Sequence, residues 1–244
     1  MPRLLLSLLA LTALPASAQD PVRLAPGHPD LAFDAVALAS GGYDVLLVEP
    51  ARQPLGTVVE TVTHHDDGTV TVTADVDIVI GNGGEQSQDT TRYAWPSLAP
   101  LSHASVDHND DGDEVQSLRF DGLHVTGAYQ DAGAPAIPVD LELAAPAFGP
   151  GSDRKVARAL PFEAGYTAVL PTFSAEDRLE AFTFTVVGRE DVERPDGSTV
   201  SAWIVEQVEE AGRARRSAVD PETRDLLRIS FSPAPGYLVH FVRQ

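Results

Sequence analysis

The stretch GTVTVTADVDIVI, residues 68–80, alternates apolar and polar side chains along its whole length. Successive side chains of an extended strand point to opposite faces, so the even-numbered positions form an apolar face and the odd-numbered ones a polar face. At roughly 3.3 Å per residue this strand reaches about 40 Å, which is longer than most strands and implies that it curves. The apolar face carries Val70, Val72, Ala74, Val76, Ile78 and Ile80.

The same two-residue period recurs in runs around residues 123–129, 137–143, 182–186, 200–208 and 237–241. Several alternating runs are joined by Asp-Gly pairs, whose tolerance of positive φ angles suits tight hairpins, and strands joined by short hairpins are antiparallel. We therefore predict a mainly β, antiparallel fold. The pairs are Asp67-Gly68, Asp111-Gly112, Asp121-Gly122 and Asp196-Gly197.

Near the C-terminus, the acidic run Asp220-Pro221-Glu222-Thr223 lies between two alternating segments. Proline suits the second position of a type I turn when Asp precedes it, so this run is predicted to be a turn rather than a catalytic cluster. The single domain is expected to span residues 43–244. No cysteine is present, so neither a disulfide framework nor a thiol nucleophile is available.

One stretch, SDRKVARAL at 152–160, predicts a short helix capped by Ser152 or Asp153. Residues 19–42 are rich in Pro, Ala and Gly and predict a loosely packed lead-in, with a short helical turn near residues 31–38.

The first residues combine Arg3, an apolar run over residues 4–14, Pro15 and the small residues 16–18. This is the layout of a secretory signal, so residues 1–18 are expected to be a signal peptide cleaved after Ala18. The apolar run is too short to span a bilayer, and no later segment is apolar enough to cross one. We expect the protein to be exported to the periplasm or the extracellular medium, and not to span the membrane.

The formal net charge is −19, and the basic residues are sixteen Arg and a single Lys, Lys155. A field of this sign repels nucleic acid and anionic lipid headgroups, so neither is an expected partner. No G-x-S-x-G elbow, H-E-x-x-H zinc motif or phosphate-binding glycine pattern is present, and the prediction leans away from an enzyme.

Six segments, in the order in which they follow along the chain, resemble an uncharacterised secreted bacterial family related to the outer-membrane lipoprotein-sorting and lipoprotein-carrier superfamily. They are YAWPSLAPLSHAS (93–105), FDGLHVTGAY (120–129), RALPFEAGYTAVLPTF (158–173), SAWIVEQ (201–207), VDPETRDLLR (219–228) and PGYLVHFVR (235–243). The resemblance implies an antiparallel half-barrel with a short helix on its concave side, and carriers in this superfamily hold acyl chains between sheet and helix. The alternation alone would also fit a lipocalin-like barrel or a sandwich.

Residues 107–118, DHNDDGDEVQSL, match the first spacings of a helical calcium loop, but Leu118 replaces the bidentate Glu that closes the shell. Without flanking helices an EF-hand is excluded. A calcium-stabilised β-turn and an acidic exposed loop remain as the two interpretations. The candidate Ca²⁺ ligands are Asp107, Asn109, Asp111 and Asp113.

Histidines 64, 65, 103 and 108 raise the question of a transition metal. Adjacent residues of a strand face opposite sides, so His64 and His65 cannot share one ion without distortion. His103 and Asp107 share a face but lie about 13 Å apart along a strand. Solvated histidines near turns are the favoured interpretation.

Two functional hypotheses remain. The first is a non-enzymatic protein that binds or shuttles an apolar ligand, a lipid or a lipoprotein acyl chain, in the concavity. The second is an envelope structural or interaction module, calcium-stabilised or not, whose concavity is filled by its own side chains. For the first, the predicted cavity residues are Val72, Val76, Ile78, Phe182, Phe184 and Trp203. The favoured interpretation of the three aromatic residues is a place in the core, and cavity lining is the alternative.

Overall fold

The computed structural model describes residues 20–80, 83–109, 111–173 and 179–244. The predicted signal peptide lies outside these residues. The N-terminal half contains β1 (Val22–Arg23), the 3-10 helix η1 (Phe33–Ala35), β2 (Gly41–Glu49), β3 (Gln53–His64), β4 (Thr69–Ile80), β5 (Gly83–Ala94), β6 (Ala99–Asn109), β7 (Gly112–Asp121), β8 (His124–Gln130) and β9 (Ile137–Glu142). The C-terminal half contains α1 (Asp153–Ala159), β10 (Thr167–Phe173), β11 (Leu179–Glu193), β12 (Thr199–Glu209), β13 (Ala214–Val219), β14 (Leu226–Phe231) and β15 (Leu238–Arg243).

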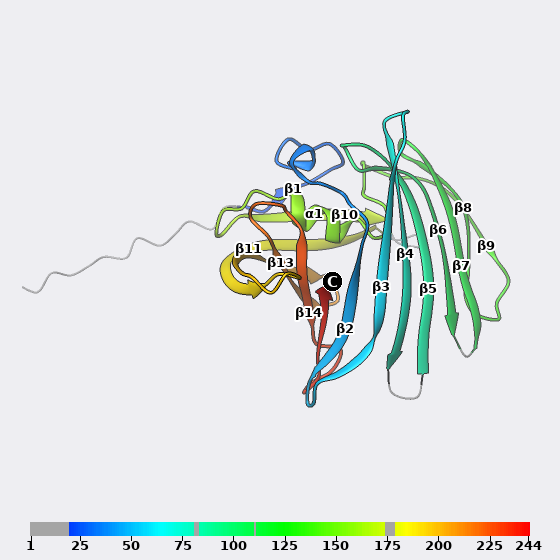
Figure 1. Cartoon of the computed structure of the whole chain (residues 1–244). Coiled ribbons are helices and arrows are strands. Elements are labelled where there is room, and N and C mark those ends of the chain that lie inside the picture. The colour runs from blue at the N-terminus through cyan, green and yellow to red at the C-terminus, as the bar shows by residue number, and fades with distance from the viewer. Residues whose placement is uncertain (1–19, 81–82, 110, 174–178) are drawn as a thin grey trace, which may run out of the picture.

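The described strands form one open sheet in the order β1-β10-β11-β12-β13-β14-β15-β2-β3-β4-β5-β6-β7-β8-β9. Two antiparallel meanders, β2–β9 and β10–β15, meet where β15 pairs with β2, and β1 adds to β10 in parallel. Figure 1 shows the sheet curving around α1. The predicted fold class, a mainly β single curved sheet with a short helix on its concave side, is confirmed.

All four predicted Asp-Gly turns join neighbouring strands. At the first of them Gly68 has φ +77°, a conformation that side chains with a Cβ rarely adopt. Asp67 supports the same turn, because its Oδ1 accepts hydrogen bonds from the Thr69 amide at 3.1 Å and hydroxyl at 2.6 Å.

The run from Asp220 to Thr223 is a turn between β13 and β14, as predicted. Asp220 is 1% exposed. Its Oδ1 accepts from the amides of Glu222 (2.8 Å) and Thr223 (3.2 Å), and its Oδ2 from Arg194 Nε (2.7 Å). The carboxylate is therefore fully engaged in holding the turn.

The alternation in β4 places the even-numbered side chains inside, where Val70, Val72 and Ala74 are at most 4% exposed. Val70 and Val72 belong to the main core cluster, together with Val156, Ala157 and Ala159 of α1. Because the helix packs against the inner face of the sheet, it occupies one end of the concavity.

Residues 20–42 are more closely packed than their composition predicts. The segment begins with β1, which pairs with β10, and contains η1 inside the predicted helical turn. Five apolar side chains from it are buried in the main core cluster, so the expectation of a loose lead-in is corrected. They are Leu24, Leu31, Phe33, Val36 and Leu38.

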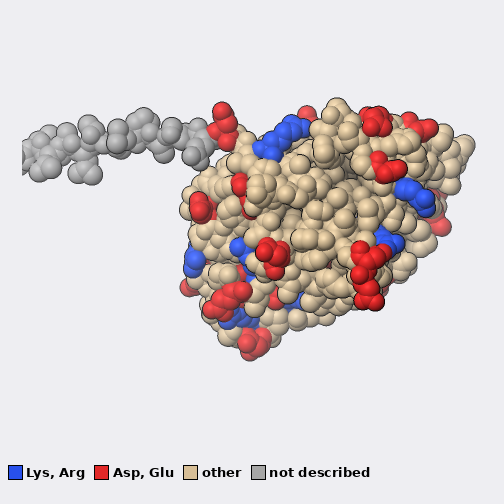
Figure 2. All heavy atoms as spheres, turned by 90° about the horizontal axis from the view of Figure 1, so that it is seen from above, with Lys and Arg blue, Asp and Glu red and all other residues tan. Residues whose placement is uncertain are grey.

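The surface matches the acidic composition. Figure 2 shows more acidic than basic side chains on the face seen from above. No helix within the described ranges is long and apolar enough to cross a membrane.

Candidate functional site

The inner face of the sheet changes from aliphatic to polar between β4 and β5. In the pairing of these strands Val72 lies opposite Thr91, Ala74 opposite Asp89 and Val76 opposite Ser87. Residues directly opposite one another share a face. Each inward row of side chains is therefore aliphatic on β4 and polar on β5.

The polar rows extend over β6 and β7. Thr91 pairs with His103, Asp89 with Ser105, and Ser87 with Asp107. The second row then reaches Gln116, which lies opposite Ser105. Small hydroxyls, carboxyls and an amide therefore face the concavity where the neighbouring strands present valines.

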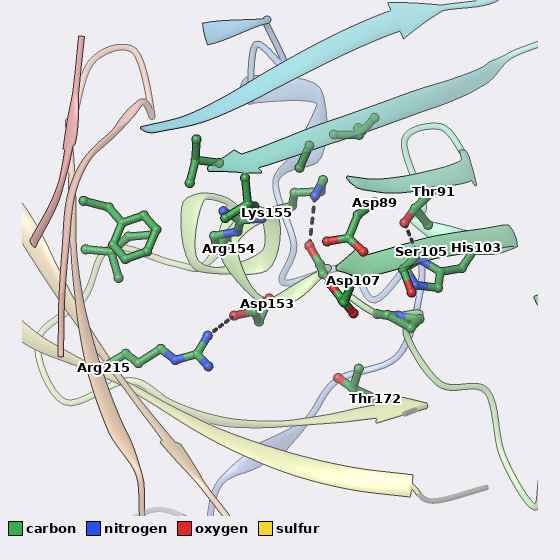
Figure 3. A pocket seen from close by; sticks show the side chains of 18 of the residues that line it. Asp89, Thr91, His103, Ser105, Asp107, Asp153, Arg154, Lys155, Thr172 and Arg215 are labelled. Carbon is green, nitrogen blue, oxygen red and sulfur yellow. Dashed lines mark hydrogen bonds and ion pairs between the residues drawn. The ribbon is translucent and has the colours of Figure 1, made fainter. Parts of the chain in front are cut away.

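These two regions line one cavity of about 650 Å³, a size typical of small-molecule sites. Figure 3 shows the polar side, with Asp89, Thr91, His103, Ser105 and Asp107 labelled. The aliphatic and aromatic lining consists of Val45, Val58, Val72, Ala74, Val76, Ile78, Phe173, Phe182, Ile229, Phe231, Val239 and Phe241.

The first turn of α1 supplies another wall, with Asp153, Arg154 and Lys155. Arg154 Nη2 lies 3.3 Å from Glu60 Oε1 on β3, and Arg215 Nη1 lies 3.5 Å from Asp153 Oδ2. These two ion pairs join the helix to the sheet on both sides of the cavity.

Lys155, the single lysine of the chain, is 6% exposed. Its Nζ donates to the carbonyl of Gly151 at 2.9 Å and lies 5.6 Å from the centroid of the Tyr93 ring. A carbonyl and an aromatic face therefore accommodate this buried ammonium.

His103 is held neutral among polar neighbours. Burial lowers its pKa to about 4, the hydrogen bond with Gln116 acts in the opposite direction, and Lys155 lowers the pKa further. Thr91 Oγ1 lies 2.8 Å from Nδ1 of the ring. The amide Nε2 of Gln116 has no partner, so its Oε1 meets the ring.

Among the described residues, two buried polar atoms of the cavity wall lack a hydrogen-bond partner: Gln116 Nε2 and Thr172 Oγ1. Gln116 is 8% exposed and Thr172 is 5% exposed. Since buried polar groups in native proteins are nearly always satisfied, these atoms are hydrogen-bonding groups of the wall that the described side chains leave unused.

Asp89 and Asp107 are the carboxylates of the polar wall. Burial raises the pKa of Asp89, against the opposing charges of Arg154 and Lys155. Burial also raises the pKa of Asp107, and the charge of Asp89 adds to this effect, whereas a hydrogen bond with Ser87 acts against it.

The predicted ligand residues separate into two groups. Val72, Val76, Ile78 and Phe182 line the cavity. Phe184 is fully buried in the main core cluster instead. Trp203 stacks on Phe162, with ring centroids 5.8 Å apart, and Arg189 lies over its ring.

The candidate calcium ligands lie on the β6–β7 hairpin. Asp107 lines the cavity, whereas Asp113 pairs with His108, whose Nδ1 lies 2.7 Å from its carboxylate. His108 and Asp107 are adjacent in β6, so the two carboxylates lie on opposite faces. Asp111 lies in the turn, and the side chain of Asn109 is outside the described part. The calcium site stays a prediction.

The histidines considered for a metal are separated. His64 Nε2 lies 3.1 Å from the carbonyl of Leu38, and His65 Nε2 lies 2.8 Å from Thr71 Oγ1. Within the described ranges, no group of three His, Cys, Asp or Glu residues could hold a metal ion.

Sequence analysis did not single out Asp89, Gln116, Thr172 or Lys155 as site residues. A signal for the polar wall was present in β5, where residues 86–92 are polar on both faces. A strand of this kind inside a sheet indicates that the interior is locally polar, since water or a ligand must satisfy these groups.

The sequence profile of a family described as "Protein of unknown function (DUF3108)" matches residues 41–241. No curated protein sequence matches the chain significantly.

Among solved structures, a β-barrel-like protein of the domain of unknown function DUF1849 from Brucella abortus is similar, with a TM-score of 0.59 at 11% identity, over 86% of this chain and 97% of that one. A DUF1089 family protein from Pseudomonas aeruginosa aligns with a TM-score of 0.38 at 14% identity, over 72% of this chain and 89% of that one. The first similarity agrees with the half-barrel fold.

Proposed function

We propose that this chain, which belongs to the DUF3108 family, is an exported, non-enzymatic protein that binds the apolar chain of a lipid or lipoprotein in the cavity of its half-barrel. The observation that carries the proposal is the row of aliphatic side chains on β2–β4 that faces a space of about 650 Å³. Protein interiors are close-packed, so an apolar wall that faces open space needs a partner to cover it.

Helix α1 leaves this wall uncovered. Val156, Ala157 and Ala159 pack against the core at one end of the concavity, whereas Asp153 and Arg154 of the first turn face the cavity. A cavity left between sheet and helix also favours a ligand-binding protein over a module whose concavity is filled by its own side chains.

The polar wall supports binding rather than catalysis. The one histidine lining the cavity among the described residues, His103, is hydrogen-bonded to Thr91 and Gln116. A general base works best with a pKa near the operating pH, and the pKa of His103, about 4, lies well below neutrality.

Export and a carrier role are parts of the same proposal. The apolar N-terminus has the pattern of a signal peptide. The resemblance to lipoprotein carriers supports a ligand held between sheet and helix, and the cavity lies in that position. The net charge of −19 favours a carrier that does not adhere to anionic membrane surfaces.

The experiment is a titration of the purified chain with dodecan-1-ol, a neutral molecule with one apolar chain, followed by calorimetry. Val76 lines the cavity, whereas Val79 of the same strand is 55% exposed. Val76→Phe fills part of the cavity and should weaken binding about tenfold or more, equivalent to about 1.4 kcal/mol. Val79→Phe is the matched control and should bind as the unaltered chain does.

Native mass spectrometry of protein purified from its host provides the second readout, and a copurifying lipid is expected. If the chain bound no dodecan-1-ol and carried no lipid, the proposal would be contradicted. The second hypothesis, an envelope interaction module, would then be favoured. Equal loss of binding in both Phe variants would also contradict it, because the ligand would then not occupy the cavity.

A further inference from the structure

The polar wall of the cavity places two carboxylates within reach of a single ligand group. Asp89 lies opposite Ser105, and Asp107 lies opposite Ser87, so the two acids are diagonal neighbours on the inner face of β5 and β6. Diagonal neighbours in a sheet are separated by about 7–8 Å. One group bound between them could contact both carboxylates.

Two arginines around the polar wall are in ion pairs. Arg154 pairs with Glu60, and Arg215 pairs with Asp153 and Glu209. Lys155 donates to the carbonyl of Gly151 instead of a carboxylate, so its charge and those of the two aspartates have no counterion in direct contact within the described residues.

No ion pair within 4.0 Å joins Asp89 or Asp107 to a basic side chain in the part of the chain that the structure describes. Both carboxylates are half-buried in the cavity wall, and a charge partly withdrawn from water is stabilised by a nearby opposite charge. The two carboxylates are thus prepared for a positive charge that the protein itself does not provide by direct contact.

The unsatisfied atoms of the wall point to the same ligand. Gln116 Nε2 is a donor in the same row as Asp89, and Thr172 Oγ1 can donate or accept. A ligand head with a cationic group and an oxygen beside it would satisfy the carboxylates and the amide together. The net charge of −19 also attracts cations and repels anions.

We infer that the ligand is a cationic amphiphile, whose apolar chain lies against β2–β4 and whose ammonium group is bound between Asp89 and Asp107. The inference rests on the proposed function and adds the chemistry of the head group. It competes with an anionic amphiphile that would be bound by Lys155, the one lysine of the chain.

The test compares three probes that share one chain length: dodecylamine, dodecan-1-ol and dodecanoate. Each is titrated below its micelle-forming concentration into the full chain near neutral pH. The amine is expected to bind about tenfold more tightly than the alcohol, and the carboxylate more weakly than the alcohol. In Asp89→Asn and in Asp107→Asn, the ratio of amine affinity to alcohol affinity should fall toward one.

Asp77→Asn is the control variant, because Asp77 lies on β4 on the exposed face; it should keep the ratio of the unaltered chain. Tighter binding of dodecanoate, lost in Lys155→Met, would overturn the inference in favour of an anionic head. If the alcohol bound as tightly as the amine, the inference about the head group would be overturned, but the proposed function would stand. Absence of binding for all three probes would overturn the proposed function as well.

Discussion

Arg154 on helix α1 and Glu60 on strand β3 form an ion pair, with Nη2 and Oε1 3.3 Å apart. The pair joins the helix to the inner face of the sheet at the border between the aliphatic and polar walls, since Glu60 lies opposite Ala74 and Ala74 opposite Asp89. It fixes the position of the helix turn that lines the cavity.

Loss of the guanidinium should therefore destabilise the fold. Arg154→Met leaves Glu60 buried without its partner and should lower the free energy of unfolding by on the order of 2 kcal/mol. The double variant Arg154→Met/Glu60→Gln should recover part of this loss, because no unpaired charge remains. Urea unfolding of the three chains measures the effect, and equal stability of the single and double variants would contradict it.

The same pair predicts a dependence on pH. Burial acts to raise the pKa of Glu60, but Arg154, Lys155, Arg158 and Arg243 more than offset it and hold the pKa below its usual 4.5. Its stabilising contribution is thus fully present above about pH 4.5 and is lost as the pH falls through the folded-state pKa. Glu60→Gln should lose less stability than the unaltered chain over that acidic range.

Adjacent valines of β3 test which side of the sheet is buried. Val58 is 1% exposed and Val59 is 45% exposed. Val58→Thr places a hydroxyl in an apolar environment and should cost roughly 1–3 kcal/mol, whereas Val59→Thr should change stability by less than about 0.5 kcal/mol. Equal losses of stability in urea unfolding would contradict the assignment of Val58 to the buried face and Val59 to the exposed face.

The sequence allowed this architecture to be predicted because strand pattern and turn chemistry are local. The alternation at Val70–Ile78 and the Asp67-Gly68 turn each depend on a few neighbouring residues. The cavity depends on pairing between strands, and Thr172 reaches its wall from a segment far along the chain from Asp89. Alternation reports the face of a strand but not the position along the barrel, so it does not distinguish a core position of Trp203 from a cavity position; in the structure Phe162 covers this ring.

His103 and His124 should differ in their titration. Burial lowers the pKa of His103 to about 4, whereas the hydrogen bond to Asp140 raises the pKa of the exposed His124. In NMR spectra recorded at decreasing pH, the ring of His124 should become protonated first and that of His103 last. A His103 ring that titrates near the usual 6.5 would contradict the assignment.

The depressed pKa of His103 also has a consequence for stability. The unfolded chain binds a proton at this residue near pH 6.5, whereas the folded chain does so only near 4. Stability is therefore lost as the pH falls between these values, by roughly 3 kcal/mol if no other group intervenes. His103→Gln should show a smaller loss across this interval, and an unchanged loss would contradict the prediction.

Asp89→Asn should stabilise the protein without ligand. The folded-state pKa of Asp89 is raised by burial, so the folded chain binds this proton more tightly than the unfolded chain, and ionisation at neutral pH opposes folding. The variant should be more stable than the unaltered chain at neutral pH, and the gain should shrink as the pH falls through the raised pKa. Destabilisation by Asp89→Asn at neutral pH would show that the carboxylate is already satisfied.

The most direct test of ligand binding in the cavity is methyl NMR of the full chain during a titration with dodecan-1-ol. Val72, Val76 and Ile78 line the cavity, whereas Val59 and Val79 are on the exposed face of β3 and β4. The account predicts that the methyl signals of the first three shift in proportion to bound ligand, while those of the last two stay in place. Shifts confined to Val59 and Val79, or no shifts at saturating ligand, would contradict it.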